Sequence, residues 1–439
     1  MLIVGGGITG ASLLYTLSGY TDIRKIALIE KYDDFALLNS NTRNNAQTLH
    51  FGDIETNYTE KNARHIKSAA EMLLRYTSSI PSKERDRVIA QCQKMVLGIG
   101  EEEIESLESL YSSWLKRLFP GIRKIGANLL EKLEPKVMEG RPHSEKVMAL
   151  LSDKGYMVNF GELTHSFIRS AKKLGKDRVS ISLGNEVLGI SRSKDGFEIR
   201  SRRGVHAARF VVFATGAYSL FFAKSMGYER NLSVLSVGGN FYTCPKVLNG
   251  KVYRVQKGGI PFAAIHGDPD IANPKITRFG PTVTIPLQLE RHNNSTTLDY
   301  MRTFDFDFKT MSTLKNVLLN KDISRIIRRN ILYMTPLLGK YEFLKKEAGR
   351  IVPSLKYSDL TFQKHMGGIR PQVIDENKGS LIVGGAKIDE EGLIFNITPS
   401  PGASSCLDSS LSDALKISEY LGIRFNGAEH AKRLGAVKA

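Results

Sequence analysis

The sequence has few cysteines and no long apolar run, and both absences limit what the chain can be. Its three cysteines, Cys92, Cys244 and Cys406, lie far apart and form no Cys-x-x-Cys pair, which argues against a zinc cluster or a disulfide framework. A reducing cytoplasm is therefore the expected compartment. No stretch reaches the ~18 apolar residues that span a bilayer, and no basic-then-apolar leader opens the chain. Any membrane contact is expected to be peripheral.

The composition is that of an ordinary globular protein with an excess of positive charge. Its 439 residues are 41% hydrophobic and 24% charged, which suits two or three domains with cores of their own. The 62 Lys and Arg outnumber the 45 Asp and Glu and give a net charge of +17. Such a charge favours an anionic partner, and nucleic acid, anionic lipid and a polycarboxylate substrate all qualify.

The first thirty residues read as a strand, a glycine turn, a helix and a second strand. Gly5, Gly7 and Gly10 form G-x-G-x-x-G between "MLIV" and a helix with apolar residues at helical spacing. This turn brings bare backbone against a pyrophosphate at the helix N-terminus. The second strand, "KIALIEK", ends at Glu30, where a carboxylate can bind a ribose hydroxyl pair. The order predicts a Rossmann-like α/β domain that binds a dinucleotide.

A later segment favours FAD over NAD alone. Residues 177–216 alternate as short strands with a hairpin turn at Asp195-Gly196, and an apolar strand then ends at Ala214 and Gly216 in "ATG". This predicts a three-stranded excursion that returns to the same sheet, with Val187 near the adenine. An ordinary β-meander followed by a core strand is the alternative for this segment alone.

A second FAD signal lies near the C-terminus. In residues 392–422 a turn that contains proline and glycine leads into a helix whose first turn is rich in small residues. Backbone amides and the helix dipole could there face the electron-rich edge of a flavin. Gly402, Ala403 and Ser404 are the expected contacts, and a plain turn before a capped helix is the alternative.

These motifs carry a resemblance to known flavoproteins. The glycine triplet, "ATGAYS" and "SPGAS" are similar to the glutathione-reductase-like proteins of the D-amino-acid-oxidase type, and "NSNTRNNAQTLH" with "ETNYT" resembles the malate:quinone oxidoreductase family. The resemblance implies FAD, with Asn45 and Thr48 beside it. It also implies oxidation of (S)-malate to oxaloacetate with electrons passed to a membrane quinone. The alternative is an FAD-dependent oxidase or dehydrogenase of another 2-hydroxy acid or an amino acid, such as L-2-hydroxyglutarate, using oxygen or another acceptor.

Oxidation of a 2-hydroxy acid requires a base for the hydroxyl proton, and histidine suits this role. Of nine histidines, His50 and His266 lie in irregular, glycine-flanked segments that match motifs of the family. Asp268, two residues beyond His266, is expected to orient its imidazole. The sequence leaves open whether His50 or His266 takes the proton.

The substrate carboxylates require cations, and arginine binds a carboxylate in a bidentate manner. Arg370 in "GGIRPQV" and Arg278 in "ITRFGPT" are the first candidates, since glycine or proline keeps the backbone beside them rigid. Arg43 is a third candidate, because it belongs to the same loop as His50. For each arginine, an ion pair between two domains is the alternative.

The positions of the cofactor and substrate motifs along the chain predict a discontinuous domain organisation. Residues 1–75, 145–235 and 366–425 are expected to build the FAD-binding domain, and residues 76–144 and 236–365 an α+β substrate domain that caps the flavin.

The segment 321–350 is strongly basic. It contains eight Lys or Arg and three Asp or Glu, a net +5, interleaved with apolar residues. It predicts either a helix that lies on an anionic membrane surface, on the inner face of the cell membrane, or a solvated helical face over the substrate domain. Nucleic-acid binding is not expected, because no recognition module is present.

Overall fold

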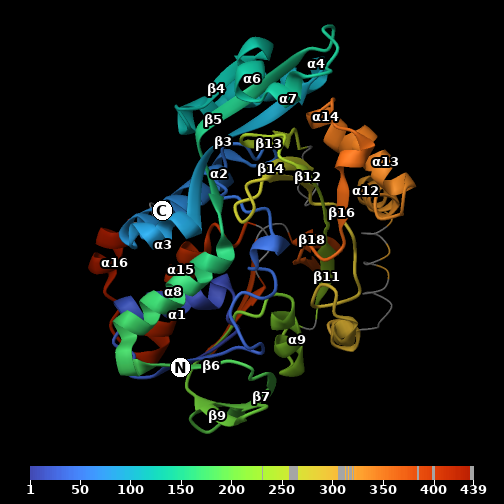
Figure 1. The fold of residues 1–439 in the computed structure, drawn as a ribbon. Helices are drawn as coiled ribbons and strands as arrows, with labels where there is room; N and C mark the ends of the chain where they lie inside the picture. Colours follow the sequence, from blue (N-terminus) through green and yellow to red (C-terminus); the bar gives the residue numbers. More distant parts are fainter. Residues whose placement is uncertain are drawn as a thin grey trace.

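The computed structural model describes residues 1–229, 231–256, 265–304, 312, 315, 319, 321–382, 385–397 and 401–435. The motif "SPGAS" (400–404) therefore lies partly outside the described residues, at position 400. Two larger sheets and two small ones, with helices around them, make up the described fold (Figure 1).

A six-stranded sheet contains the N-terminal strand and confirms the α/β prediction. Its order is β19 (Ala386–Glu390), β20 (Leu393–Ile397), β10 (Val211–Phe213), β1 (Leu2–Val4), β2 (Ile26–Ile29) and β6 (Val179–Ser182). All neighbours pair in parallel except β19 and β20. The four central strands, β20, β10, β1 and β2, are almost wholly apolar, as expected for a parallel sheet covered on both faces.

Helices cover one face of this sheet, and a meander with a further helix covers the other. α1 (Ile8–Tyr20) packs against both α8 (Phe160–Gly175) and α15 (Cys406–Leu421), and Ile3 of β1 points into this layer. Leu2 and Val4 point to the opposite face, which is covered by α9 (Tyr218–Ser225) and the meander strands.

The predicted three-stranded excursion is confirmed. Its antiparallel strands are β7 (Val187–Ser193), β8 (Gly196–Ser201) and β9 (Gly204–Ala208). Gly196 has φ +137, a backbone conformation that favours glycine, so the expected hairpin turn lies where the sequence places it.

An eight-stranded mixed sheet forms the second large element. Its order is β16 (Thr361–Gln363), β12 (Phe241–Pro245), β15 (Ile276–Gly280), β14 (His266–Pro269), β13 (Lys251–Arg254), β3 (Ile89–Ile99), β5 (Val147–Val158) and β4 (Arg123–Gly126). A smaller antiparallel sheet consists of β11 (Leu232–Gly238), β17 (Ile369–Asp375) and β18 (Ser380–Ile382). β5 pairs with β3 and β4 in this sheet, although the predicted boundary at residue 145 assigns it to the FAD-binding domain. The division into two domains stays a prediction.

The remaining helices surround the sheets. They are α2 (Glu60–Ser79), α3 (Ser82–Val88), α4 (Glu101–Leu110), α5 (Lys116–Leu118), α6 (Ala127–Leu133), α7 (Pro135–Met138), α10 (Thr297–Met301), α12 (Lys321–Leu332), α13 (Leu338–Phe343), α14 (Gly349–Ile351) and α16 (Gly427–Leu434). Within the described ranges, no helix combines the length and the apolarity needed to cross a membrane.

Candidate active site

A cavity of about 910 Å³ lies against the carboxyl ends of the parallel strands. Its wall includes the ends of β1, β2 and β10, the loop that follows β2, the start of β17 and the turn before α15. Open α/β sheets bind their ligands at this end of the strands. The cavity therefore brings together the segments that the sequence assigned to cofactor and substrate.

The glycine turn at one end of the cavity fits a dinucleotide. Gly5 has φ +107, and a Cβ there would lie 2.5 Å from the carbonyl oxygen of Ala214. A Cβ on Gly10 would lie 2.0 Å from the carbonyl oxygen of Gly5, so Gly10 allows the helix to pack on the strand. The N-cap residue of α1 is Gly7, which has no side chain to cap the helix. The dipole of α1 can therefore attract an anion at this end.

Glu30, at the end of the second strand, contacts the backbone of the glycine turn. Its carboxylate accepts hydrogen bonds from the backbone N–H of Gly6 at 2.5 Å and of Tyr32 at 2.9 Å. Burial raises the pKa of Glu30. The carboxylate is thus held at the edge of the cavity, where the sequence expects it to meet a ribose.

The other residues predicted to contact the cofactor are also in the cavity wall, with one exception. Gly10 lies behind the wall and acts through packing. The residues in the wall are Gly5, Gly7, Glu30, Asn45, Thr48, Val187, Ala214, Gly216, Gly402, Ala403 and Ser404.

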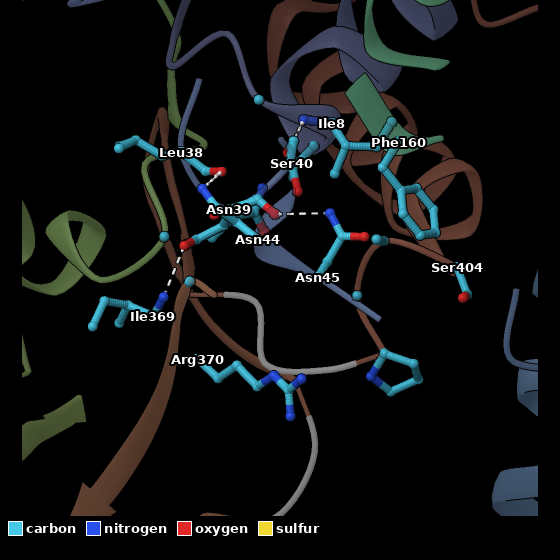
Figure 2. Close-up of a pocket in the computed structure, with 18 of the residues that line it drawn as sticks. Ile8, Leu38, Asn39, Ser40, Asn44, Asn45, Phe160, Ile369, Arg370 and Ser404 are labelled. Atoms are coloured by element: carbon cyan, nitrogen blue, oxygen red, sulfur yellow. Dashed lines mark hydrogen bonds between the residues drawn. The ribbon is translucent and has the colours of Figure 1, made fainter. Parts of the chain in front are cut away.

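The polar loop after β2 is held by its own side chains. Asn44 Nδ2 donates to the carbonyl of Leu38 at 2.9 Å, and Asn45 Nδ2 donates to the carbonyl of Asn41 at 2.8 Å. Figure 2 shows two further bonds, in which the backbone N–H of Ile8 donates to Ser40 and that of Ile369 donates to Asn39. These bonds join the loop to α1 and to β17. Its polar side chains thus fix a backbone whose only regular structure is a short 3-10 helix, Thr42–Asn44, and a single bridge from Thr48 to Met157 of β5.

His50 reaches the cavity wall from this loop and is fixed on two sides. Its Nδ1 lies 2.5 Å from Glu55 Oε1, and its backbone N–H donates to Ser404 Oγ at 3.0 Å. Burial alone would raise the pKa of Glu55, but the hydrogen bond and charge of His50, followed by the charge of Lys94, lower it to about 2. Glu55 is therefore an ionised partner for the imidazole.

A buried ion pair lies close to His50 and its partner Glu55. Lys94 Nζ is 2.5 Å from Asp53 Oδ1, and both side chains are nearly inaccessible to solvent. Burial raises the pKa of Asp53, against the charge of Lys94.

His266 contributes to another part of the wall. Its Nε2 lies 3.0 Å from Asp268 Oδ2, and its ring stacks on Tyr253 with centroids 4.4 Å apart. Lys251 Nζ lies 3.0 Å from Asp268 Oδ1, and the charges of His266 and Lys251 lower the pKa of Asp268 to about 2 although burial opposes this. Tyr253 Oη in turn shares a hydrogen bond of 2.6 Å with Thr48 Oγ1. Asp268 lies behind the imidazole, outside the wall.

Arg370 projects from β17 into the cavity (Figure 2). Burial lowers the pKa of Arg370, and the guanidinium forms no hydrogen bond or ion pair with any residue that the structure describes. Other cations in the wall are already paired. Lys31 lies 2.7 Å from Glu290, Arg254 lies 3.2 Å from both Glu103 and Glu347, and Lys387 pairs with Asp413. Arg370 is therefore the guanidinium in the described wall that retains its capacity to bind an anion.

Comparison with known proteins matches residues 1–417 to the family described as malate:quinone oxidoreductase (Mqo). The chain belongs to the malate:quinone oxidoreductase family. It is 39% identical to a probable malate:quinone oxidoreductase of Campylobacter jejuni, over 99% of this chain and 98% of the relative. It is 36% identical to the malate:quinone oxidoreductase of Helicobacter pylori, over 97% and 95% of the two chains.

A solved structure with FAD bound, the L-α-glycerophosphate oxidase of Mycoplasma pneumoniae, has the same fold. It superposes with a TM-score of 0.66 at 18% identity, and the match covers 95% of this chain and 94% of that one. The predicted fold class is confirmed. As a member of the malate:quinone oxidoreductase family the chain is an oxidoreductase, and membership in this family implies a flavin.

Two predicted substrate contacts need correction. Arg278 does not line the cavity, because its side chain is 1% exposed and turns into the protein. It donates to the carbonyl of Asn45 at 2.8 Å, lies 3.4 Å from Asp270 Oδ2 and stacks over Phe241 at 4.1 Å. Arg43 is exposed and also lies outside the wall. Arg278 supports the His50 loop from behind, and neither side chain is placed to bind substrate.

Several residues that position the site carry little or no signal in the sequence. Glu55 follows His50 by five residues within the quoted family motif, so its carboxylate could have been proposed as the partner of the imidazole. Lys94, Lys251 and Tyr253 had no such signal, because they belong to strands that read as core. Only pairing in the eight-stranded sheet brings these side chains beneath the loop.

Proposed function

We propose that this chain oxidises (S)-malate to oxaloacetate, with FAD as its cofactor and a quinone as its electron acceptor. One observation carries the proposal: a single cavity has a dinucleotide-binding turn at one end, and it also contains an imidazole–carboxylate pair and an arginine without a described partner. Membership in the malate:quinone oxidoreductase family supports the same reaction.

The residues present fit FAD. Gly5 and Gly7 leave room for a pyrophosphate at the N-terminus of α1, and Glu30 can accept hydrogen bonds from the ribose. The turn at Gly402 and Ser404 brings the N-terminus of α15 to the same cavity, where it favours negative charge. FAD, when bound, supplies an acceptor for two electrons.

We take His50 as the base, because its side chain is 17% exposed in the cavity wall whereas that of His266 is 2% exposed. If Nδ1 donates its proton to Glu55, Nε2 keeps the lone pair and can accept the proton of the substrate hydroxyl. Glu55 then stabilises the imidazolium that forms, because its own low pKa keeps it ionised. His266 has a similar carboxylate partner, Asp268, and stays the second candidate.

Arg370 would bind a carboxylate of the substrate. Its fork of N–H donors suits bidentate binding, and in the described part of the chain nothing competes for it. The bound carboxylate would place the carbon that bears the hydroxyl at a fixed distance from the arginine. The orientation needed for reaction then comes from binding.

Anaerobic mixing of the yellow enzyme with substrates tests the proposal. We expect (S)-malate to bleach the flavin absorbance, and (R)-malate to leave it unchanged. Bleaching by L-2-hydroxyglutarate or an amino acid, but not by (S)-malate, would replace this function with the alternative one. Reoxidation of the bleached enzyme by a soluble quinone, and much more slowly by oxygen, would identify the acceptor.

Quinones reside in the bilayer, so we further propose that the enzyme works as a peripheral protein on the cytoplasmic face of the cell membrane. The basic segment 321–350 supports this position through its charge.

A further inference from the structure

Apolar side chains are exposed where α12 passes into α13. We define the apolar ridge as Ile331, Met334, Leu337, Leu338 and Tyr341. Leu337 is 77% exposed, and the other four are between 40% and 57% exposed. Ile331 lies at the end of α12, Met334 and Leu337 lie in the turn that follows, and Leu338 and Tyr341 lie three residues apart on one side of α13. Adjacent exposed apolar residues mark an interaction surface, whereas isolated ones need no explanation.

The ridge is not required to complete the core. The inner side of the same segment is already anchored by Tyr333 and Phe343, which are fully buried. Tyr242 Oη donates to the carbonyl of Tyr333 at 2.6 Å, and the rings of Tyr242 and Phe343 stack with centroids 4.2 Å apart. The segment is thus fixed from within while its outer apolar side chains remain in water.

Backbone strain occurs at the most exposed position of the ridge. Leu337 has φ +58 and ψ −67, a conformation that a side chain with a Cβ adopts at an energetic cost. Glycine or asparagine would adopt positive φ more readily. A strained leucine at the tip of an exposed turn is explained if its side chain is needed on the outside.

The surroundings of the ridge are cationic. Lys321, Arg325 and Arg328 are exposed on α12, and Lys345 is exposed in the turn that follows α13, within the segment of net charge +5. This charge disfavours a second copy of the chain as the occupant, because two such faces would repel each other. Four of the five ridge side chains are not aromatic, and the single ring of Tyr341 does not make the row of stacking surfaces on which nucleic-acid bases bind.

We propose that the apolar ridge inserts into the interface of an anionic lipid bilayer, with the surrounding lysines and arginines on the lipid headgroups. An apolar strip bordered by cations has the chemistry of this boundary. The inference rests on the proposed function, because docking here would bring the enzyme to a quinone that resides in the bilayer. It assigns the membrane contact to a defined surface.

Vesicle flotation with the FAD-loaded full-length enzyme tests the surface. We expect binding to vesicles that contain phosphatidylglycerol, weaker binding to phosphatidylcholine alone, and loss of binding at high salt. The double variant Leu337→Asp/Leu338→Asp should bind at least about tenfold more weakly, because it places charge where the ridge would meet lipid. The matched control is Val205→Asp on β9, an apolar residue that is 61% exposed outside the segment, and it should bind as the wild type does.

The variant Leu337→Gly distinguishes a loss of membrane binding from a loss of folding stability. It removes the strain, so its melting temperature should equal or exceed that of the wild type while its vesicle binding falls. Turnover of malate with a soluble quinone should be unchanged in all these variants. Vesicle binding therefore tests the membrane surface, and turnover separately tests the proposed function. Equal vesicle binding by the double variant and the wild type would overturn the inference. So would a dimer that the double variant dissociates, since the ridge would then be a subunit interface.

Discussion

Replacement of Arg370 by methionine should weaken substrate binding without destabilising the fold. Methionine keeps most of the apolar stem and removes the guanidinium. In the free enzyme this half-buried cation forms no ion pair within the described residues, and its removal from water lowers its pKa, so the folded state bears part of its desolvation cost. The unfolding free energy of Arg370→Met should therefore equal or exceed that of the wild type.

The loss in binding should be large, because a carboxylate would pair with this cation away from water. Truncating one partner of a desolvated charge pair costs ~2–5 kcal/mol, which corresponds to roughly 30-fold to 4000-fold in affinity. Two measurements check this: the KM for malate with a soluble quinone, and the Kd of succinate from the change it causes in the flavin spectrum. Succinate is a dicarboxylate without the hydroxyl, so its binding is independent of the chemical step.

Arg141→Met is the matched control. Arg141 is buried, and its Nη1 lies 2.6 Å from Glu145 and its other nitrogens donate to the carbonyls of Val137 and Arg350, away from the cavity. Its loss should lower stability by about 1–3 kcal/mol through unpaired buried carbonyls and leave the Kd of succinate unchanged. The reasoning is refuted if Arg370→Met binds succinate normally and loses stability instead.

Three further predictions concern the base, its partner and the glycine turn. His50→Gln should retain FAD but reduce with malate roughly 10²–10⁴-fold more slowly, as measured by anaerobic stopped-flow absorbance; a rate near that of the wild type would remove His50 as the base. In Glu55 the folded-state pKa of about 2 lies below the ordinary value of 4.5, so the carboxylate stabilises the fold above pH 4.5 and this contribution is lost as the pH falls toward 2. Urea unfolding should show Glu55→Gln less stable by about 3 kcal/mol at neutral pH and by progressively less below pH 4.5; a difference that does not depend on pH would contradict this. Gly10→Ala should lower the ratio of flavin to protein absorbance, because its Cβ would lie 2.0 Å from a backbone oxygen, whereas Gly121→Ala, with nothing within 4 Å, should not.

Much of the fold was predictable because its signals are local. The glycine turn, the strand that ends at Glu30 and the hairpin at Asp195-Gly196 each depend on steric limits within a few residues. The apolar run of β5 resembles a buried strand of either sheet, so the sequence does not decide between them. Only its pairing with β3 and β4 places it in the eight-stranded sheet.

The arginines show the limit of local signals. Arg278 and Arg370 are both flanked by residues that stiffen the backbone, and the sequence makes both of them candidates to bind substrate. The folded structure places Asp270 and a backbone carbonyl against Arg278, and it leaves Arg370 facing the cavity. Which arginine is available to a substrate depends on neighbours far away in the chain.

The sequence by itself determined the dinucleotide-binding turn and the polar loop with His50, because backbone sterics and residue spacing act over short distances. Tertiary structure decided the partners of the charged groups. Glu55 and Asp268 hold the two histidines, and Arg370 has no described partner. The physical reason is that burial and charge pairing, which set the pKa and the availability of each group, depend on how distant segments pack.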